Sequence, residues 1–326
     1  MSDRLRFGLV GAGAIAQTYA QAFSDSQEAV AVAVADVRPE AAEALAERLS
    51  CAAFPDHQAM LDDGSIDAVV IATPPATHPE ICIAAVSRGI PVLCEKPLAV
   101  DVASARGMVE AANKAGVLLT MASKFRYVDD VIRAKSIVAS GILGEIILFE
   151  NTFTSRVDMG GRWNSKPQHS GGGVLIDNGT HSVDLMRYFL GPIAEVQAVE
   201  GKNVQGLQVE DTVRLFVRSE GGVMGSVDLS WSLNKELESY VNIYGSHGTI
   251  QVGWKSSRYR QSSSSDWVEF GHGYDKLQAF SRKLENFCQA VRGERRLLID
   301  AEDAIASVEV IEKAYASLED NRWITV

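Results

Sequence analysis

The sequence predicts an α/β protein of two domains, a doubly wound parallel sheet followed by an α+β domain with a largely antiparallel sheet. The chain has 326 residues, a length that exceeds one usual domain. Of these residues 46% are apolar, which is enough for a sizeable core. Its first third alternates short apolar runs with alanine-rich helical segments, and after about residue 122 longer alternating runs replace them. We therefore expect domains at residues 1–122 and 123–326, with the C-terminal helix able to pack back on the first.

In the first domain, short apolar runs end in turn or polar residues, as strands of a parallel sheet do. The runs are RLRFGLVG, AVAVAVADV, IDAVVIATPP, IPVLCEKP and VLLTMASKF. The helical segments between them are Pro39–Leu49, Thr77–Arg88 and Asp101–Ala115. Asp101 suits an N-cap, and Gly89 and Gly116 stand where helix ends favour glycine.

The second domain begins with a helix expected at Asp129–Ser140. Alternating runs follow: EIILFENTF, DTVRLFVRS, GGVMGSVDLSW and SYVNIYGSHGTIQV. In DTVRLFVRS the alternation places Val213, Leu215 and Val217 on one face, and RSEGGVM is a good hairpin turn. Helices return at Asp275–Val291 and Asp300–Leu318.

Charge and cysteine usage narrow the class of partner. A net charge of −11 and a pI near 5.1 argue against broad binding to nucleic acid or anionic membranes. The four cysteines are far apart and form no CxxC pair, and no apolar run is long enough for a signal peptide or a membrane span. We expect a cytoplasmic protein without a metal site.

The segment FGLVGAGAIAQTYA carries Gly11-x-Gly13-x-x-Ala16 between an apolar strand and a helix that opens at Ala14 and Ile15. Glycines let the backbone approach a pyrophosphate, and the helix N-terminus offers amide groups and a positive dipole end. With its strand and helix context, the motif predicts a dinucleotide site at Gly11, Gly13, Ala14 and Ile15.

A dinucleotide site of this kind needs an acidic residue at the end of the second strand. Asp36 stands at that position, in AVADVRPE. A carboxylate there accepts hydrogen bonds from a ribose 2′-hydroxyl and repels a 2′-phosphate, so NAD is favoured over NADP. Arg38 is either a second cofactor contact, on a phosphate or the adenine, or a solvated charge at a helix start. A glycine turn that binds no nucleotide is the alternative for the whole motif.

Loops at the carboxyl ends of parallel strands line the ligand crevice of such a sheet. IATPPATH therefore makes Thr73, Pro74 and His78 candidates for contact with the cofactor, although His78 is equally plausible as a plain helix N-terminal residue. In CEKPLAV, Glu95 and Lys96 emerge at the same edge, where Lys96 could polarise an oxygen or serve only as a surface lysine. A cis Lys96–Pro97 bond would direct Lys96 into the crevice, and X–Pro bonds form cis most readily.

The stretch GGGVLIDNGTHSVDL places three glycines before a helix that carries polar residues on one stripe. Asp177, His181, Asp184 and Tyr188 follow at helical spacing. His181 suits proton transfer, Asp177 can orient it, and the glycines would let a substrate approach the pair. The alternatives are a solvated face, a metal site, and, for Asp184, an interior residue that bonds backbone amides.

Together, GLVGAGAIA, ADVRPE, TPPATH, EKP and GGGVLIDNGTHSVDL resemble the glucose–fructose oxidoreductase / inositol dehydrogenase / MocA family over most of the chain. The resemblance implies a Rossmann domain, a second domain on an open antiparallel sheet, oxidation of a sugar or cyclitol hydroxyl with NAD(P), and homodimers or homotetramers paired through that sheet. Lys96, Asp177 and His181 match the family's EKP lysine and its Asp-x-x-x-His pair.

The implied reaction transfers hydride from a substrate C–H to nicotinamide C4, while His181 takes the hydroxyl proton and Lys96 bonds the same oxygen. Substrate contacts are expected from Lys124 and Arg126, where SKFRYVDD departs from the Asn-Arg type of many relatives, and from Arg162 and Trp163. The latter two could instead belong to a mobile loop or a subunit contact. Two other functions stay open: a hydrolase or lyase that uses NAD for a transient keto intermediate, and a non-catalytic NAD sensor.

Overall fold

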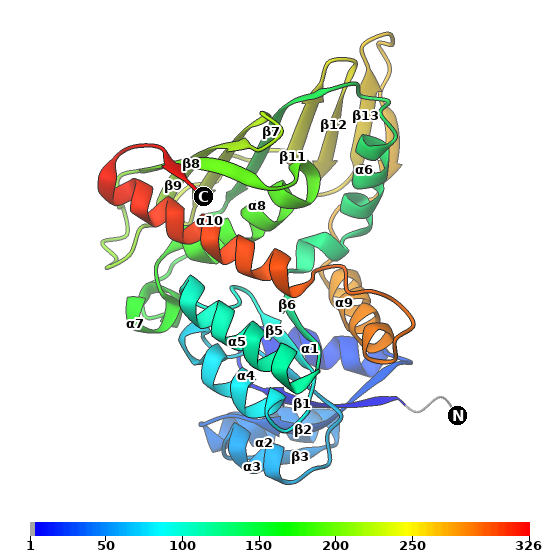
Figure 1. The fold of residues 1–326 in the computed structure, drawn as a ribbon, viewed down its shortest axis with the longest axis vertical. Helices are drawn as coiled ribbons and strands as arrows, with labels where there is room; N and C mark the ends of the chain where they lie inside the picture. The colour runs from blue at the N-terminus through cyan, green and yellow to red at the C-terminus, as the bar shows by residue number, and fades with distance from the viewer. Residues whose placement is uncertain (1–3) are drawn as a thin grey trace. The chain divides into compact units, whose positions relative to one another are not determined.

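The computed structural model describes residues 4–326, which divide into two compact units (Figure 1). The first unit contains the chain up to Lys124 together with Lys276–Ile305, and the second contains Phe125–Asp275 and Ala306–Val326. The first three residues of the expected first domain lie outside the described range. The boundary after Lys124 lies close to the one expected after residue 122. The expected second domain, residues 123–326, is not a single unit, because Lys276–Ile305 belongs to the first unit.

The first unit is built on a parallel sheet with strand order β3-β2-β1-β4-β5-β6. Its strands are β1 (Leu5–Val10), β2 (Ala29–Ala35), β3 (Ala52–Phe54), β4 (Ala68–Ile71), β5 (Val92–Glu95) and β6 (Leu119–Ala122). The order reverses between β1 and β4, so the fold is the doubly wound one expected. Folds of this type bind ligands at that switch point. The three-residue strand β3 was missed, since it is too short for a periodic signal.

Helices cover this sheet. They are α1 (Ala14–Asp25), α2 (Pro39–Leu49), α3 (His57–Asp62), the 3-10 turn η1 (Pro75–Thr77), α4 (His78–Val86), α5 (Val102–Ala115) and α9 (Lys276–Val291). Each of the four expected with defined ends in this unit forms within two residues of those ends, whereas α3 and η1 were not expected. Asp101 caps α5 by accepting the Ser104 N–H at 2.7 Å. Gly116 ends α5 with φ +68, a conformation that glycine adopts without strain.

Helix α9 joins the first unit because its apolar face completes that unit's core. Phe280, Leu284, Phe287 and Cys288 are buried in one cluster with residues of α1 and the sheet. The Phe287 ring lies 5.9 Å from the ring of Phe7 on β1. A helix far along the sequence is therefore an integral part of the dinucleotide-type unit.

The second unit is built on a sheet with strand order β14-β13-β12-β11-β7-β10-β9-β8-β15. Its strands are β7 (Ile146–Thr154), β8 (Ile193–Glu200), β9 (Thr212–Ser219), β10 (Met224–Ser230), β11 (Ser239–Gly245), β12 (Gly248–Gly253), β13 (Ser257–Gln261), β14 (Val268–Gly271) and β15 (Ile324–Thr325). Every pairing is antiparallel except that of β7 with β10. The expected hairpin joins β9 to β10, and Val213, Leu215 and Val217, predicted to share one face of the strand, are all buried.

Helices and short turns complete the second unit, and some of the helices pack against its sheet. They are α6 (Asp129–Ala139), α7 (Pro167–Ser170), α8 (Val174–Leu190) and most of α10 (Ala301–Asp320), with short 3-10 turns η2 (Lys124–Tyr127) and η3 (Trp163–Ser165). Helix α8, which carries the expected catalytic pair, packs against β7, β9 and β10. Within residues 4–326, no helix combines the length and the apolar character that a membrane span requires.

Candidate functional site

The turn between β1 and α1 has the geometry of a phosphate-binding loop. Gly11 has φ +99, and a Cβ there would lie 2.7 Å from the Ala72 carbonyl oxygen, so only glycine fits. At Gly13 a Cβ would meet no atom within 4 Å, which leaves open space beside the backbone. Helix α1 begins at Ala14, its N-cap glycine has no capping side chain, and Ile15 lies in the same first turn. The first-turn amides can therefore bind an anion.

Asp36 lies beside this turn and is held as an acceptor. Its Oδ2 accepts the Ala12 N–H at 2.7 Å, and its Oδ1 accepts the Arg38 N–H at 2.9 Å. Burial raises the pKa of Asp36, but these hydrogen bonds and the Arg38 guanidinium outweigh it, so its pKa is lowered and the carboxylate is charged at neutral pH. Arg38 remains 59% exposed while its Nε lies 3.2 Å from Oδ1. The turn and this carboxylate fit a dinucleotide with a free ribose 2′-hydroxyl.

His78 has a different role from the cofactor contact considered in the sequence. Its side chain has no exposed surface, and its Nδ1 lies 3.0 Å from the Pro97 oxygen. Its Nε2 lies 2.9 Å from the Thr73 oxygen, so the ring ties the loop after β4 to the loop after β5. Burial lowers the pKa of His78. Thr73 and Pro74 remain half-buried at this edge and can contact a ligand.

Lys96 follows β5 directly and is half-buried at the carboxyl edge of the sheet. The Lys96–Pro97 bond is cis, the isomer considered in the sequence analysis. The neighbouring Glu95, expected to contact the cofactor, is buried instead. Its Oε1 accepts the Tyr19 O–H at 2.7 Å and lies 2.9 Å from Lys283 Nζ. The carboxylate is therefore part of the interior of the first unit.

Lys124 emerges beside Lys96 because their strands are neighbours in register. Glu95 at the end of β5 pairs with Ala122 at the end of β6, so the chain leaves both strands at one edge. Burial and the neighbouring Lys96 ammonium lower the pKa of Lys124 to about 8. The first unit thus places two lysines at the edge where a ligand crevice is expected.

On α8 the expected pair lies one turn apart, with Asp177 half-buried and His181 only 6% exposed. The His181 ring packs edge-on against Phe125, with centroids 5.0 Å apart at 80°. This burial excludes the solvated-face interpretation of the stripe for His181. Across residues 4–326, no group of three His, Cys, Asp or Glu side chains is arranged to hold a metal ion.

Arg126 is buried rather than presented to a substrate. Its Nε lies 2.8 Å from Asp184 Oδ1, and both side chains are almost completely shielded from solvent. Asp184 is interior as expected, and it forms an ion pair with a guanidinium that the sequence analysis did not foresee. Because Arg126 follows Phe125 directly, this ion pair fixes the residue that packs against His181. The ion pair of Arg126 with Asp184 therefore stabilises the position of Phe125 beside His181.

Two of the three glycines before α8 are explained by other atoms of the protein. A Cβ on Gly172 would lie 1.9 Å from the Tyr315 hydroxyl, and one on Gly173 would lie 2.1 Å from the Glu210 carbonyl oxygen. Glu210 Oε1 accepts the N–H groups of Gly173 and Leu175, each at 3.0 Å, and the Tyr315 O–H at 2.8 Å. The interpretation that the loop exists for substrate access is therefore wrong for Gly172 and Gly173. The absence of their side chains makes room for Tyr315 and Glu210, and Glu210 accepts the first amides of α8.

The aromatic surroundings of His181 include a residue that the sequence analysis missed. Trp254 is 39% exposed and packs on Tyr240 at 4.7 Å and near Phe125 at 6.4 Å. Trp163 is also 40% exposed, on the turn η3 beside the exposed Arg162. Nothing local marks Trp254, because it joins this cluster through Phe125, a residue far from it in the sequence that also contacts His181.

Comparison with known proteins identifies both units. Residues 5–123 match the model described as "Oxidoreductase family, NAD-binding Rossmann fold", and residues 131–251 match the GFO/IDH/MocA C-terminal domain. Inositol 2-dehydrogenase of Rubrobacter xylanophilus is 30% identical over 97% of this chain and 92% of its own.

Solved structures agree with the fold over the whole chain. The WlbA dehydrogenase of Bordetella pertussis, in complex with NADH and UDP-GlcNAcA, is 26% identical with a TM-score of 0.85 and covers 99% of both chains. Levoglucosan dehydrogenase, in complex with NADH and levoglucosan, has a TM-score of 0.92 at 24% identity and covers 99% of both chains.

Proposed function

Since this chain belongs to the GFO/IDH/MocA family of NAD-binding oxidoreductases, we propose that it is an NAD-dependent dehydrogenase that oxidises a secondary hydroxyl of a sugar or cyclitol. Relatives named as inositol 2-dehydrogenases and D-glucoside 3-dehydrogenase support this substrate class. One observation carries the proposal. Lys96 follows its strand at the same edge of the sheet as Gly11, Gly13 and Asp36, and this arrangement supports a dinucleotide site beside Lys96.

Oxidation of a secondary alcohol removes a hydride from the carbon and a proton from the hydroxyl group, and each residue of the site has a separate role in this reaction. Bound NAD supplies the acceptor for the hydride that leaves the carbon. His181 takes the hydroxyl proton, and Lys96 donates a hydrogen bond to the same oxygen, where negative charge develops. Asp177, one helical turn from His181, orients the imidazole and can bind a neighbouring hydroxyl. The alcohol becomes a ketone, and one proton is released.

Substrate contacts are assigned to the exposed and half-buried polar groups. Lys124 stands beside Lys96, while Arg162 and Trp163 lie on the exposed turn η3. Trp163 and Trp254 each offer an indole face that can stack on the C–H side of a sugar ring. Because Arg126 is held by Asp184, we give it a supporting role and not a direct contact.

The test is an absorbance screen at 340 nm, a wavelength at which NADH absorbs and NAD does not. Purified protein is mixed with NAD, and separately NADP, against cyclitols, aldoses, sugar acids and sugar phosphates. We expect NADH formation with a sugar or cyclitol, and a loss of roughly 100-fold or more in kcat for His181→Asn and Lys96→Met.

Exposed residues of the same types serve as controls: Lys114→Met and His272→Asn should leave the rate unchanged. An active enzyme whose rate survives His181→Asn would overturn the assignment of roles. Tight NAD binding without turnover on any member of the panel would favour the hydrolase, lyase or sensor functions.

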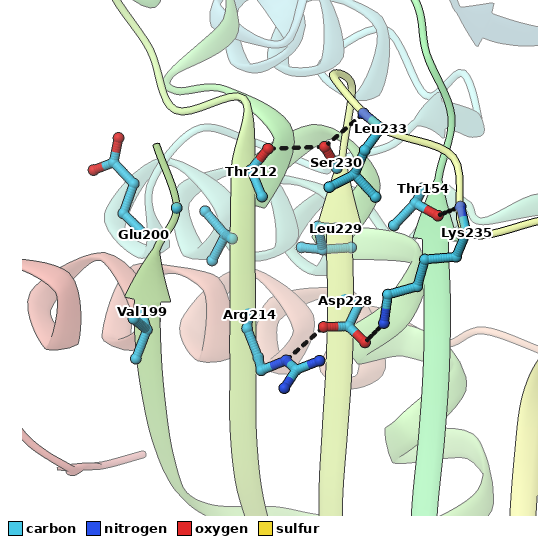
Figure 2. A pocket seen from close by; sticks show the side chains of 12 residues that line it. Thr154, Val199, Glu200, Thr212, Arg214, Asp228, Leu229, Ser230, Leu233 and Lys235 are labelled. Carbon is cyan, nitrogen blue, oxygen red and sulfur yellow. Dashed lines mark hydrogen bonds and ion pairs between the residues drawn. The ribbon is translucent and has the colours of Figure 1, made fainter. Parts of the chain in front are cut away.

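The open face of the large sheet supports a further part of the proposal, self-association. A groove of about 280 Å³ lies on this face. In it Asp228 lies between Arg214 and Lys235, and both are 2.5 Å from its carboxylate oxygens (Figure 2). Exposed apolar side chains lie in or near it on this face: Val199, Phe216, Met224 and Leu233. A sheet face of this composition suits burial against a second copy.

Light scattering after gel filtration tests the association. We expect a mass of two or four times 35.2 kDa for the native protein and a shift toward 35.2 kDa for Phe216→Asp. A monomeric native protein at micromolar concentration would exclude it. The reducing cytoplasm is proposed as the compartment because Cys51, Cys82, Cys94 and Cys288 are all free thiols.

A further inference from the structure

Lys283 on α9 is a buried cation that the proposed reaction does not use. Its side chain has no exposed surface, and its Nζ lies 2.9 Å from Glu95 Oε1. The ammonium also lies over the Phe280 ring, 3.8 Å from its centroid, and 4.6 Å from the centroid of Tyr19. Burying a lysine is costly, and an apolar side chain would fill the same core without that cost. The position of its partner, Glu95, explains why a lysine is present at position 283.

Glu95 is the residue immediately before Lys96, and it is held from two sides. Its Oε1 accepts the Tyr19 O–H at 2.7 Å in addition to the Lys283 ammonium. Burial raises the pKa of Glu95, but the charge of Lys283 and the hydrogen bonds from Tyr19 and Lys283 outweigh it, so the pKa is lowered. The carboxylate is therefore charged, and charge-assisted bonds fix its position.

Lys283 also connects the two strands that end at the candidate site. Its Nζ lies 3.5 Å from the Ala122 carbonyl oxygen at the end of β6, and Ala122 pairs with Glu95 at the end of β5. Tyr19 belongs to α1, the helix whose first turn forms the dinucleotide loop. One network thus joins the cofactor helix, both strand ends and the residue that precedes Lys96.

We propose that Lys283, together with Tyr19, is a positioning residue that fixes Lys96 through the carboxylate of Glu95. This inference rests on the proposed role of Lys96 in the reaction. The side chain of Lys96 can move only as far as its backbone allows, and that backbone continues directly from the anchored Glu95. Misplacement of a reacting group by about 1 Å can reduce a rate roughly 100-fold without changing what binds.

Kinetics of two variants test the proposal. Lys283→Met removes the cation, and Glu95→Gln/Lys283→Met removes both charges, so the double variant leaves no uncompensated buried carboxylate if the single variant fails to fold. For the double variant we expect native-like unfolding, KM for NAD within about twofold, and kcat reduced roughly 10- to 100-fold. A double variant with the native kcat would show that the pair only balances charge, and would overturn the proposal.

A measurement without substrate separates this inference from the proposed function. Limited reductive methylation followed by peptide mass spectrometry reports the labelling rate of each lysine. We expect Lys283→Met or the double variant to change the rate at Lys96 at least threefold while the exposed Lys114 keeps its rate. An unchanged Lys96 rate would overturn the positioning role. A native enzyme inactive on every substrate would instead refute the proposed reaction, whatever the labelling shows.

Discussion

Two glycine-rich loops in this protein each precede a helix, and they exist for opposite reasons. Before α1, the missing Cβ of Gly13 faces open space, with no atom within 4 Å. Before α8, the missing Cβ atoms of Gly172 and Gly173 leave room for Tyr315 and Glu210. The first loop leaves space for a ligand, whereas the second is filled by the chain itself.

The comparison shows that a glycine run predicts a close approach but not what approaches. In the first loop the N-terminal amides of α1 have no capping side chain, so an anion can bind them. In the second loop the Glu210 carboxylate already accepts the first amides of α8. A helix N-terminus that already has its acceptor is part of the scaffold that positions Asp177 and His181.

The largest effect is expected from Gly173→Ala. Its Cβ would lie 2.1 Å from a backbone oxygen, so the loop or the Glu210 segment must shift, at a cost of about 3 kcal/mol in the free energy of unfolding. Urea denaturation measures this loss. Gly221→Ala is the control, because its nearest contact is 3.7 Å, and its stability should stay within about 0.5 kcal/mol of native. Native stability in Gly173→Ala would contradict the packing account.

Gly13→Ala should have the opposite signature. The new methyl group meets no protein atom, so the melting temperature should remain close to that of the native protein. The methyl would occupy space beside the helix N-terminus, and we expect NADH to bind at least about tenfold more weakly. Titration followed by NADH fluorescence gives the Kd. If the Kd were unchanged, the first loop could not be the pyrophosphate site.

The smallest effect concerns pH and Glu210. Burial raises the pKa of Glu210 more than its hydrogen bonds lower it, so the folded protein holds this proton to higher pH than the unfolded chain. Its contribution to stability is therefore greatest below the unfolded pKa of about 4.3 and falls as pH rises through the raised folded pKa. Glu210→Gln removes that fall, so it should destabilise more at pH 4.5 than at pH 7 in urea melts. A larger loss at pH 7 would reverse the sign and contradict this account.

Much of the first unit could be predicted from local pattern. Helix α2 has the expected bounds of Pro39–Leu49, and Asp101 caps α5, because these depend on neighbours within a turn. The parallel sheet, the glycine turn and Asp36 follow from short motifs in a fixed order. The match to an NAD-binding Rossmann family confirms that cofactor class.

Burial could not be predicted in the same way. His78 and Glu95 were expected near the cofactor because they stand at strand ends, yet each is enclosed by segments distant in sequence. Arg126 was expected to meet a substrate, and its partner Asp184 lies on a helix that the local pattern did not connect with it. The sequence around a polar residue does not indicate which distant group will form a hydrogen bond or ion pair with it.

The sequence by itself determined the fold class, the cofactor turn, and Lys96, Asp177 and His181 as candidates, because periodicity and spacing act over a few residues. Only the tertiary structure decided that α9 completes the first unit, that Lys283 reaches Glu95, and that Glu210 and Tyr315 fill the second glycine loop. Those contacts join residues separated by 188, 37 and 105 positions. Partners so far apart are chosen by how whole elements pack, a choice that no short stretch of sequence contains.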